Sequence, residues 1–273
     1  MNMAKYNIEK ASRFWSKRLK STDPLAAVLT YNAPKALNEA YDLWEKETLK
    51  SAFPRSLKGK KALDIGCGVG RITLTLAKLG ADVSAVDISA AMLGHLEKTA
   101  RKEKLGNRIN LVQSSSAELP FKDKSFEIIT CFGLLEHLPE EVRRKTMHEA
   151  FRVIQPKGKM FVVINNADCV FLEKSYPMKS QRGDGYFVTL VGLEWLEKVC
   201  KVNRMKIRTI AANPRYALNH YFISPDRKSY FGSEQNFARF CERSAKYDLL
   251  ASLDNPGLNK LASHFMVHIS GRS

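Results

Sequence analysis

One stretch of the chain constrains the fold more than any other, residues 61–71, KALDIGCGVGR. An apolar run that contains Asp64 is followed by three glycines at alternate positions, Gly66, Gly68 and Gly70. An amphipathic helical pattern starts directly after them. A strand, a glycine turn and a helix in this order open a nucleotide-binding α/β unit. Because glycine has no side chain and adopts positive φ, the turn leaves the backbone open to a ligand.

The glycine spacing narrows the choice of ligand. The pattern G-x-G-x-G lacks the third glycine of the dinucleotide fingerprint G-x-G-x-x-G, so a nicotinamide cofactor is not the first expectation. An ordinary strand-to-helix turn that binds nothing is the alternative interpretation.

Beyond the glycine turn, short apolar runs alternate with helical patterns. Further strands are expected at 82–86, 109–113, 126–132 and 160–165. Helices are expected after the second strand, to about Lys104, and from Pro139 to about Val153. Repeated β-α-β units with right-handed crossovers require a parallel sheet with helices on both faces. The sequence therefore predicts an α/β fold for this central part.

The segment before the glycine turn is expected to be helical. Residues 5–20 form a basic amphipathic pattern with Trp15 on the apolar face. We favour packing of this aromatic face on the rest of the protein over contact with a membrane surface. A loop is expected from Pro24 to Pro34, and a second helix at 36–52.

The regular alternation of strands and helices becomes less clear after the fifth strand. A helix is expected near 192–202, a strand near 204–210, an insertion at 212–258 and a last strand at 263–269. We therefore divide the chain into an N-terminal helical lid segment at 1–54, a core at 55–211, and a substrate-side insertion with the final strand at 212–273.

Length and cysteine usage favour a cytoplasmic protein. A chain of 273 residues can bury a full core, and it has no apolar run of membrane-spanning length and no signal-peptide pattern at its start. Its 5 cysteines are scattered without a C-x-x-C pair, which favours reduced thiols over disulfides. The histidines show no zinc-ligand spacing with these cysteines.

The net charge of +16 is concentrated on the two flanks. Residues 1–61 carry +7 and residues 166–273 carry +6, whereas residues 62–165 carry only +3. Basic flanks suggest an anionic partner, such as a charged small substrate, a membrane surface or RNA. A lysine-rich surface that only maintains solubility is an equally weighted alternative.

Candidate ligand-binding residues follow the strands, because ligands bind at the carboxyl ends of parallel strands. Asp87 ends the second strand about 20 residues beyond the glycines and can accept hydrogen bonds from both hydroxyls of a ribose. Capping of the next helix is the alternative role, but Ser89 already fits it. A serine run, Ser114–Ser116, follows the third strand and either contacts a purine or forms a polar loop.

Glu136 and His137, after the fourth strand, are the best titratable candidates for catalysis. An imidazole with an ordinary pKa near 6.5 serves as a general base close to neutral pH. The alternative is that Glu136 caps a helix or forms a structural pair and that His137 packs beneath the loop.

These motifs resemble those of class I S-adenosylmethionine-dependent methyltransferases. The resemblance covers roughly residues 55–210 and rests on five motifs in family order, which are Leu63–Gly70, Val86–Ser89, Leu119–Phe121, Ser125–Ile129 and Arg152–Gly158. The segment Thr130–Pro139 is especially similar to the O-methyltransferases of ubiquinone biosynthesis.

The resemblance implies a Rossmann-like sheet of seven strands, six parallel and the last antiparallel, with Ser263–Ile269 inserted between strands five and six. It implies S-adenosylmethionine as the cofactor, with the glycines on its methionine moiety, Asp87 on the ribose and Phe132 against the cofactor. Ser115 or Ser116 with Ala117 would flank the adenine. The residues expected to bind the cofactor are Asp64, Gly66, Cys67, Gly68, Gly70, Asp87, Ile88, Ser115, Ser116, Ala117 and Phe132.

The chain departs from the family pattern at two positions that bear on chemistry. The acid that many relatives place near the adenine is replaced by the serine run. The metal-associated Glu-x-x-Glu-His pattern of some quinone O-methyltransferases has Gly133 at its first position here, so no metal is expected.

The expected function is therefore methyl transfer from S-adenosylmethionine to a small anionic or amphiphilic acceptor, with O-methylation favoured. His137 would be the general base and Glu136 its partner. Residues suggested for the acceptor lining are Tyr31, Arg182, Tyr186, Arg215, Tyr216 and His220. The alternatives are a tRNA methyltransferase that uses the basic flanks, and a non-catalytic protein that binds the cofactor or activates a partner.

Overall fold

The computed structural model describes residues 6–30, 35–53, 56–167, 169, 184–213, 232–233, 235–237, 239–240 and 263–271. Of the residues suggested for the acceptor lining, five therefore lie outside the described part of the chain, namely Tyr31, Arg182, Arg215, Tyr216 and His220. Most of the expected insertion at 212–258 lies outside it as well.

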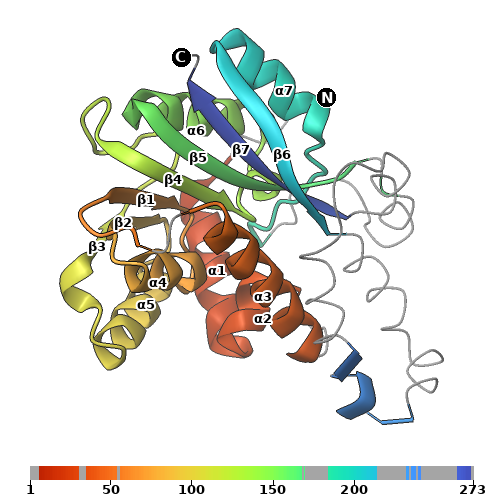
Figure 1. The fold of residues 1–273 in the computed structure, drawn as a ribbon. Helices are drawn as coiled ribbons and strands as arrows, with labels where there is room; N and C mark the ends of the chain where they lie inside the picture. Colours follow the sequence, from red (N-terminus) through yellow and green to blue (C-terminus); the bar gives the residue numbers. More distant parts are fainter. Residues whose placement is uncertain are drawn as a thin grey trace.

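A seven-stranded sheet forms the centre of the described structure (Figure 1), in the order β3-β2-β1-β4-β5-β7-β6. Its strands are β1 (Lys61–Ile65), β2 (Asp82–Asp87), β3 (Ile109–Gln113), β4 (Phe126–Phe132), β5 (Ile154–Asn165), β6 (Met205–Asn213) and β7 (His264–Gly271). β7 lies between β5 and β6 and is antiparallel to both. The predicted Rossmann-like sheet with six parallel strands and an antiparallel last strand is confirmed.

Helices cover both faces of the sheet. They are α1 (Ile8–Ser21), α2 (Pro24–Val28), α3 (Lys35–Ser51), α4 (Arg71–Lys78), α5 (Ala90–Lys102), α6 (Glu140–Val153) and α7 (Leu193–Val202), with short 3-10 turns η1 (Gly106–Arg108) and η2 (Leu135–His137). One core contains α6 and α7 residues, and the other contains α3 and α4 residues. Successive β4 residues serve opposite faces, Ile128 in the second core and Ile129 in the first. This two-sided burial explains the continuously apolar strands.

Helix α1 packs against the domain as the favoured interpretation predicted. Ala11 is fully buried, and Trp15 packs with Ala27, Val69 and Met92. In Figure 1, α1, α2 and α3 form a layer beside the strand ends, next to α4 and α5.

The expected loop after Pro24 is wrong over its first residues, which form α2. The Asp23 carboxylate accepts hydrogen bonds from the backbone N–H groups of Leu25 and Ala26, and Pro24 occupies the first helical position. An aspartate cap followed by proline is a helix-start signal that fits these contacts. β5 is also longer than the predicted strand at 160–165, because it begins at Ile154.

Candidate functional site

The glycine turn lies at the carboxyl end of β1 and is held in a left-handed conformation. φ is +71° at Gly66, +52° at Gly68 and +88° at Gly70. A Cβ atom at Gly66 would lie 3.0 Å from Leu134, and one at Gly68 would lie 3.0 Å from Val28. A side chain at either position would be strained and crowded, so these two positions require glycine.

Glycine is required at position 70 for a different structural reason. It is the N-cap residue of α4, and a Cβ atom there would overlap the side chain of Leu96 from α5. Gly70 therefore allows α4 and α5 to approach each other beneath the turn.

Asp87 connects β2 to the glycine turn. Its Oδ2 accepts a hydrogen bond of 2.9 Å from the Gly68 N–H, and its Oδ1 accepts one of 2.9 Å from the Ser89 N–H. Burial raises the pKa of Asp87 to about 6, although these hydrogen bonds oppose the shift. The predicted capping role of Ser89 is confirmed, since its hydroxyl accepts a hydrogen bond from the Met92 N–H. Asp87 is therefore not needed as the cap of α5.

Asp64 lies beneath the turn and is almost fully buried. Its two carboxylate oxygens accept hydrogen bonds from the hydroxyls of Thr73 on α4, at 2.6 Å, and Thr130 on β4, at 2.8 Å. Burial raises the pKa of Asp64, and the two threonine hydroxyls counteract that shift. Asp64 therefore ties β1, α4 and β4 together where the strands end.

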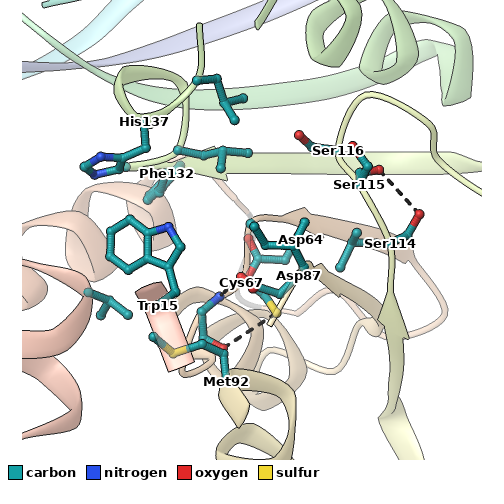
Figure 2. A pocket seen from close by; sticks show the side chains of 18 of the residues that line it. Trp15, Asp64, Cys67, Asp87, Met92, Ser114, Ser115, Ser116, Phe132 and His137 are labelled. Carbon is teal, nitrogen blue, oxygen red and sulfur yellow. Dashed lines mark hydrogen bonds between the residues drawn. The ribbon is translucent and has the colours of Figure 1, made fainter. Parts of the chain in front are cut away.

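A main cleft opens over these strand ends, and Figure 2 shows Trp15, Asp87, Phe132 and His137 around it. The predicted site residues that line it are Asp64, Gly66, Cys67, Gly68, Asp87, Ile88, Ser115, Ser116, Phe132 and His137. Gly70, Ala117 and Glu136 lie outside this lining. The structure thus brings residues from β1, β2, β4 and the segment after β3 to one place.

The serine run forms one end of the cleft, and each hydroxyl has a neighbour in the protein. Ser114 donates to the Glu118 carbonyl, and Ser116 lies 2.8 Å from the hydroxyl of Thr146 on α6. The Ser115 hydroxyl accepts a hydrogen bond from the Ala117 N–H. Each serine hydroxyl can make a further hydrogen bond, because a hydroxyl both donates and accepts.

The other end of the cleft is aromatic and is completed by α1. The Trp15 ring meets the His137 ring edge-on, with 4.9 Å between their centroids, and Figure 2 shows the two side chains close together. Tyr6 also lines the cleft. Its pKa is raised to about 12, chiefly by burial and further by the negative charge of Asp87. Residues from the N-terminal helical layer therefore form part of the site.

His137 is held by the segment that precedes α7. Its Nδ1 lies 2.9 Å from the Phe187 carbonyl oxygen, and the Thr189 N–H donates to the Glu136 carbonyl. Burial lowers the pKa of His137 to about 4, below the ordinary value near 6.5 on which the general-base prediction rested, so the imidazole is a weaker base than expected. A neutral imidazole that donates from Nδ1 keeps an unprotonated Nε2.

A second chamber adjoins the main cleft. The two share the lining residues Val28, Arg71, Gly133 and His137. The other lining residues of the second chamber are Arg18, Leu29, Thr30, Tyr41, Glu45, Glu136, Asn165, Tyr186, Val188 and His264. Tyr186, which was suggested for the acceptor lining, is one of these residues, and its role towards an acceptor stays a prediction.

Two residues that line the second chamber each carry a buried side-chain oxygen atom that has no hydrogen-bond partner among the described residues. They are Oε2 of Glu136 and Oδ1 of Asn165. Glu136 is 8 % exposed and Asn165 is 2 % exposed. Burial raises the pKa of Glu136 to about 7, and the negative charge of Glu45 adds to this shift.

Arg71, directly after the glycine turn, forms a buried ion-pair network with α3. Its Nη1 lies 2.8 Å from Asp42 Oδ1 and 2.6 Å from Glu45 Oε2. Burial raises the pKa of Glu45, whereas Arg71 acts against that rise. Removing one member of such a pair leaves a buried charge without compensation. The network therefore couples the N-terminal layer to the turn.

Among the lining residues that were not predicted from the sequence are Tyr6, Arg71, Asn165 and His264. Asn165 ends β5, and His264 begins the antiparallel β7 opposite it. Ligands bind at the carboxyl ends of parallel strands, and this rule was applied only to the first four strands of the sequence. The same strand-end rule, applied to the last strands, would have identified both residues. No local pattern marks Tyr6 or the partners of Arg71.

The described ranges lack two kinds of feature. No helix there is long and apolar enough to cross a membrane. No group of three or more His, Cys, Asp and Glu side chains there is arranged to hold a metal ion. The expectation that no metal takes part stays a prediction.

Comparisons with known proteins agree with this geometry. Residues 62–158 match a family model described as a methyltransferase domain. The ubiquinone biosynthesis O-methyltransferase of Coxiella burnetii is 34 % identical over 142 residues, which are 52 % of this chain and 53 % of that protein. The enzyme of the same name from Methylococcus capsulatus is 31 % identical over 141 residues, 52 % of each chain. The chain spans about half the length of the curated relatives it matches.

Among solved structures, magnesium protoporphyrin IX methyltransferase from Synechocystis PCC 6803, with bound SAH, has a similar fold. The TM-score is 0.56 at 15 % identity, covering 87 % of this chain and 86 % of that one. At this identity, the likeness concerns the fold alone.

Proposed function

We propose that this chain, whose residues 62–158 match a methyltransferase domain, is a class I S-adenosylmethionine-dependent methyltransferase that methylates a hydroxyl group of a small acceptor. The observation that carries the proposal is that His137 lies between a cleft suited to the cofactor and a second chamber suited to the acceptor. The O-methyltransferase relatives support the same reaction type.

The main cleft has the features that the cofactor requires. The bare glycine backbone would accommodate the methionine moiety, and Leu134 and Val28 form the walls beside Gly66 and Gly68. Each Asp87 oxygen already accepts one N–H and retains a second lone pair for a ribose hydroxyl.

The adenine end and the central wall of the cleft involve further predicted residues. Ser115 and Ser116, with Ala117 behind them, would flank the adenine, and Phe132 would lie against the cofactor. Asp64, Cys67, Gly70 and Ile88 would support the turn from beneath and beside it. These roles make up the proposed cofactor site.

When bound, S-adenosylmethionine supplies a methyl group on a positively charged sulfur, which leaves as a neutral thioether. His137 would accept the proton of the acceptor hydroxyl at Nε2, because Nδ1 is committed to the Phe187 carbonyl. Glu136 would support the acceptor from the adjoining chamber. Holding the hydroxyl in line with the reacting carbon contributes much of the rate.

The N-terminal segment at 1–54 would act as the lid of the core at 55–211. Trp15 and Tyr6 line the main cleft, while Arg18 and Tyr41 line the second chamber. Such a cover excludes water and selects the substrate. The segment at 212–273 would contribute the remaining acceptor side and the last strand.

The charge of the second chamber favours an amphiphilic acceptor over a strongly anionic one. Arg71 is already paired with Asp42 and Glu45, so its charge is compensated. The aromatic and aliphatic walls of Tyr41, Tyr186 and Val188 suit the apolar part of such an acceptor.

Incubation of the protein with cell extract and isotopically labelled S-adenosylmethionine, followed by identification of the labelled product, tests the function. We expect a labelled O-methyl small molecule that is absent with the Asp87→Ala variant. Label in tRNA would favour the RNA-modifying alternative. Calorimetric binding of the cofactor without any labelled product would favour the non-catalytic alternative.

A further inference from the structure

Arg143 on α6 is a buried arginine that forms no ion pair within the described ranges. It is 5 % exposed, and its side chain there donates to two backbone carbonyls and to no carboxylate. Arginine is almost never buried this far unless it is paired. Burial lowers the pKa of Arg143 to about 10, although the negative charges of Glu136 and Glu140 oppose the shift. The hydrogen bonds to the guanidinium therefore offset part of the cost of removing its charge from water.

Both of these hydrogen bonds are made to the turn η2, which carries Glu136 and His137. Nε donates to the Leu135 carbonyl at 2.8 Å, and Nη2 donates to the Leu138 carbonyl at 2.7 Å. The two carbonyls belong to the residues directly before and directly after the Glu136–His137 pair. A planar guanidinium donates along fixed directions, so it sets the positions of the two carbonyls relative to each other.

The guanidinium is itself held by neighbouring helices. Its Cζ atom lies 5.1 Å from the centroid of the Trp195 ring on α7, which is a cation–π arrangement. The backbone N–H of Arg143 donates to the Pro139 carbonyl at 2.9 Å, in the first turn of α6. One side chain thus connects the turn to two helices.

Arg143 lies behind the site rather than in it, because it lines neither the main cleft nor the second chamber, whereas His137 lines both. The His137 ring is held at Nδ1 by the Phe187 carbonyl, and the Thr189 N–H donates to the Glu136 carbonyl. These contacts orient the ring only while the backbone of the turn keeps one conformation. The two hydrogen bonds from Arg143 restrict that backbone.

We propose that Arg143 is a positioning residue, which fixes η2 so that His137 keeps one orientation and one tautomer towards the site. The inference rests on the proposed role of His137 as the general base and deepens it. Arg143 acts through the backbone of the turn and touches neither cofactor nor acceptor. Without its hydrogen bonds, the turn would adopt further conformations, and His137 would lose its fixed contact with Phe187.

NMR spectroscopy of the full-length protein with isotopically labelled histidine tests this proposal without an acceptor. The ring-nitrogen shifts report the tautomer, and the spectrum of His137→Ala identifies the signal. We expect the wild type to carry the proton on Nδ1 and Arg143→Met, which has a similar length but no donor, to show a mixture. Hydrogen exchange at the backbone N–H groups of His137 and Thr189 should become at least about 10-fold faster in this variant, because two charge-assisted hydrogen bonds are lost.

Arg144→Met is the matched control, because it makes the same change at the next position of α6. Arg144 also lies near the Trp195 ring, at 6.0 Å, but its side chain binds Glu140 rather than η2. This variant should behave as the wild type. Arg143→Lys keeps the charge and a donor, and it serves if Arg143→Met fails to fold. An ammonium group does not reproduce the planar fork, so exchange should still be about 3-fold faster or more.

The link to the reaction is tested by the initial rate of labelled-product formation in cell extract at saturating S-adenosylmethionine. We expect Arg143→Lys to lower this rate about 10-fold, while its calorimetric affinity for S-adenosylhomocysteine stays unchanged. Wild-type spectra, exchange and rate in Arg143→Lys, or equal effects in Arg144→Met, would overturn the proposal. If the wild type yields no labelled product, the proposed function fails, whereas the NMR comparison still decides whether Arg143 fixes the turn.

Discussion

The Nδ1 atom of His137 lies 2.9 Å from the carbonyl oxygen of Phe187. A carbonyl oxygen can only accept, so Nδ1 carries the proton of a neutral imidazole and Nε2 keeps its lone pair. The backbone before α7 therefore selects the tautomer that a general base in the loop after β4 requires. The low pKa of about 4 keeps this imidazole neutral throughout the ordinary pH range.

His137→Ala is expected to lower kcat about 100-fold, in the range typical of losing a general base, with little change in cofactor affinity. His148→Ala, which alters an exposed histidine on α6, is the matched control. Wild-type activity should not fall through protonation of His137 until the pH approaches 4. Steady-state kinetics between pH 5 and 9 check both statements, and normal turnover of His137→Ala would remove the base assignment.

Glu136→Gln is expected to stabilise the protein in a pH-dependent way. The folded-state pKa of Glu136, about 7, lies above its ordinary value of 4.5, so the folded protein binds the proton more tightly. The cost of the buried charge is therefore absent below about pH 4.5, grows as the pH rises, and is complete above about pH 7.

The gain from the glutamine should reach at most about 3 kcal/mol at pH 8 and vanish near pH 4. Urea denaturation of both proteins at the two pH values measures it. His137 contributes a slope of opposite sign, because burial lowers its pKa, but that slope is common to both proteins and cancels. A gain that is equal at both pH values would contradict the expectation.

Asp87→Asn is expected to weaken binding of S-adenosylhomocysteine at least 10-fold, because an amide offers only one acceptor oxygen where the carboxylate offers two. Wild-type affinity should also decline as the pH falls through about 6, where Asp87 becomes protonated. Isothermal calorimetry at pH 5 and 8 measures both effects. Asp82→Asn alters an exposed carboxylate at the other end of β2 and should leave the affinity unchanged.

Gly70→Ala is expected to destabilise the fold by about 1–3 kcal/mol or more, because φ is +88° and the new methyl group would overlap Leu96. Gly94→Ala provides the contrast within α5. A Cβ atom there has nothing within 4 Å, so this change should stabilise the protein by about 1 kcal/mol. Thermal unfolding of the two variants checks the pair, and equal effects would contradict the packing argument.

The features that could be predicted from the sequence are those set by residues close together in the chain. Strand positions follow from apolar runs buried on two faces, as in β4, which begins and ends at the predicted residues. The positive φ angles of the glycine turn are a property of a short segment, and the Ser89 cap joins residues only three positions apart. The short helix α2 was missed although its signal, Asp23 followed by Pro24, was local as well.

The strand-end rule correctly predicted residues of the cleft because it depends only on the topology of the sheet. Parallel strands bring their carboxyl ends to one edge of the sheet. The glycine turn, Asp87 and His137 therefore meet in one cleft, independently of how the side chains between them pack. Applied to β5, the same rule would have included Asn165.

The amino-acid sequence by itself determined the α/β sheet, the open turn from Gly66 to Gly70 and the acid that faces it, because periodicity and backbone freedom are properties of short segments. Only the tertiary structure decided that Trp15 meets His137, that Phe187 sets the imidazole tautomer, and that Glu136 and Asn165 line one chamber. Such contacts join segments far apart in the chain. They arise from how whole elements pack, which no local pattern specifies.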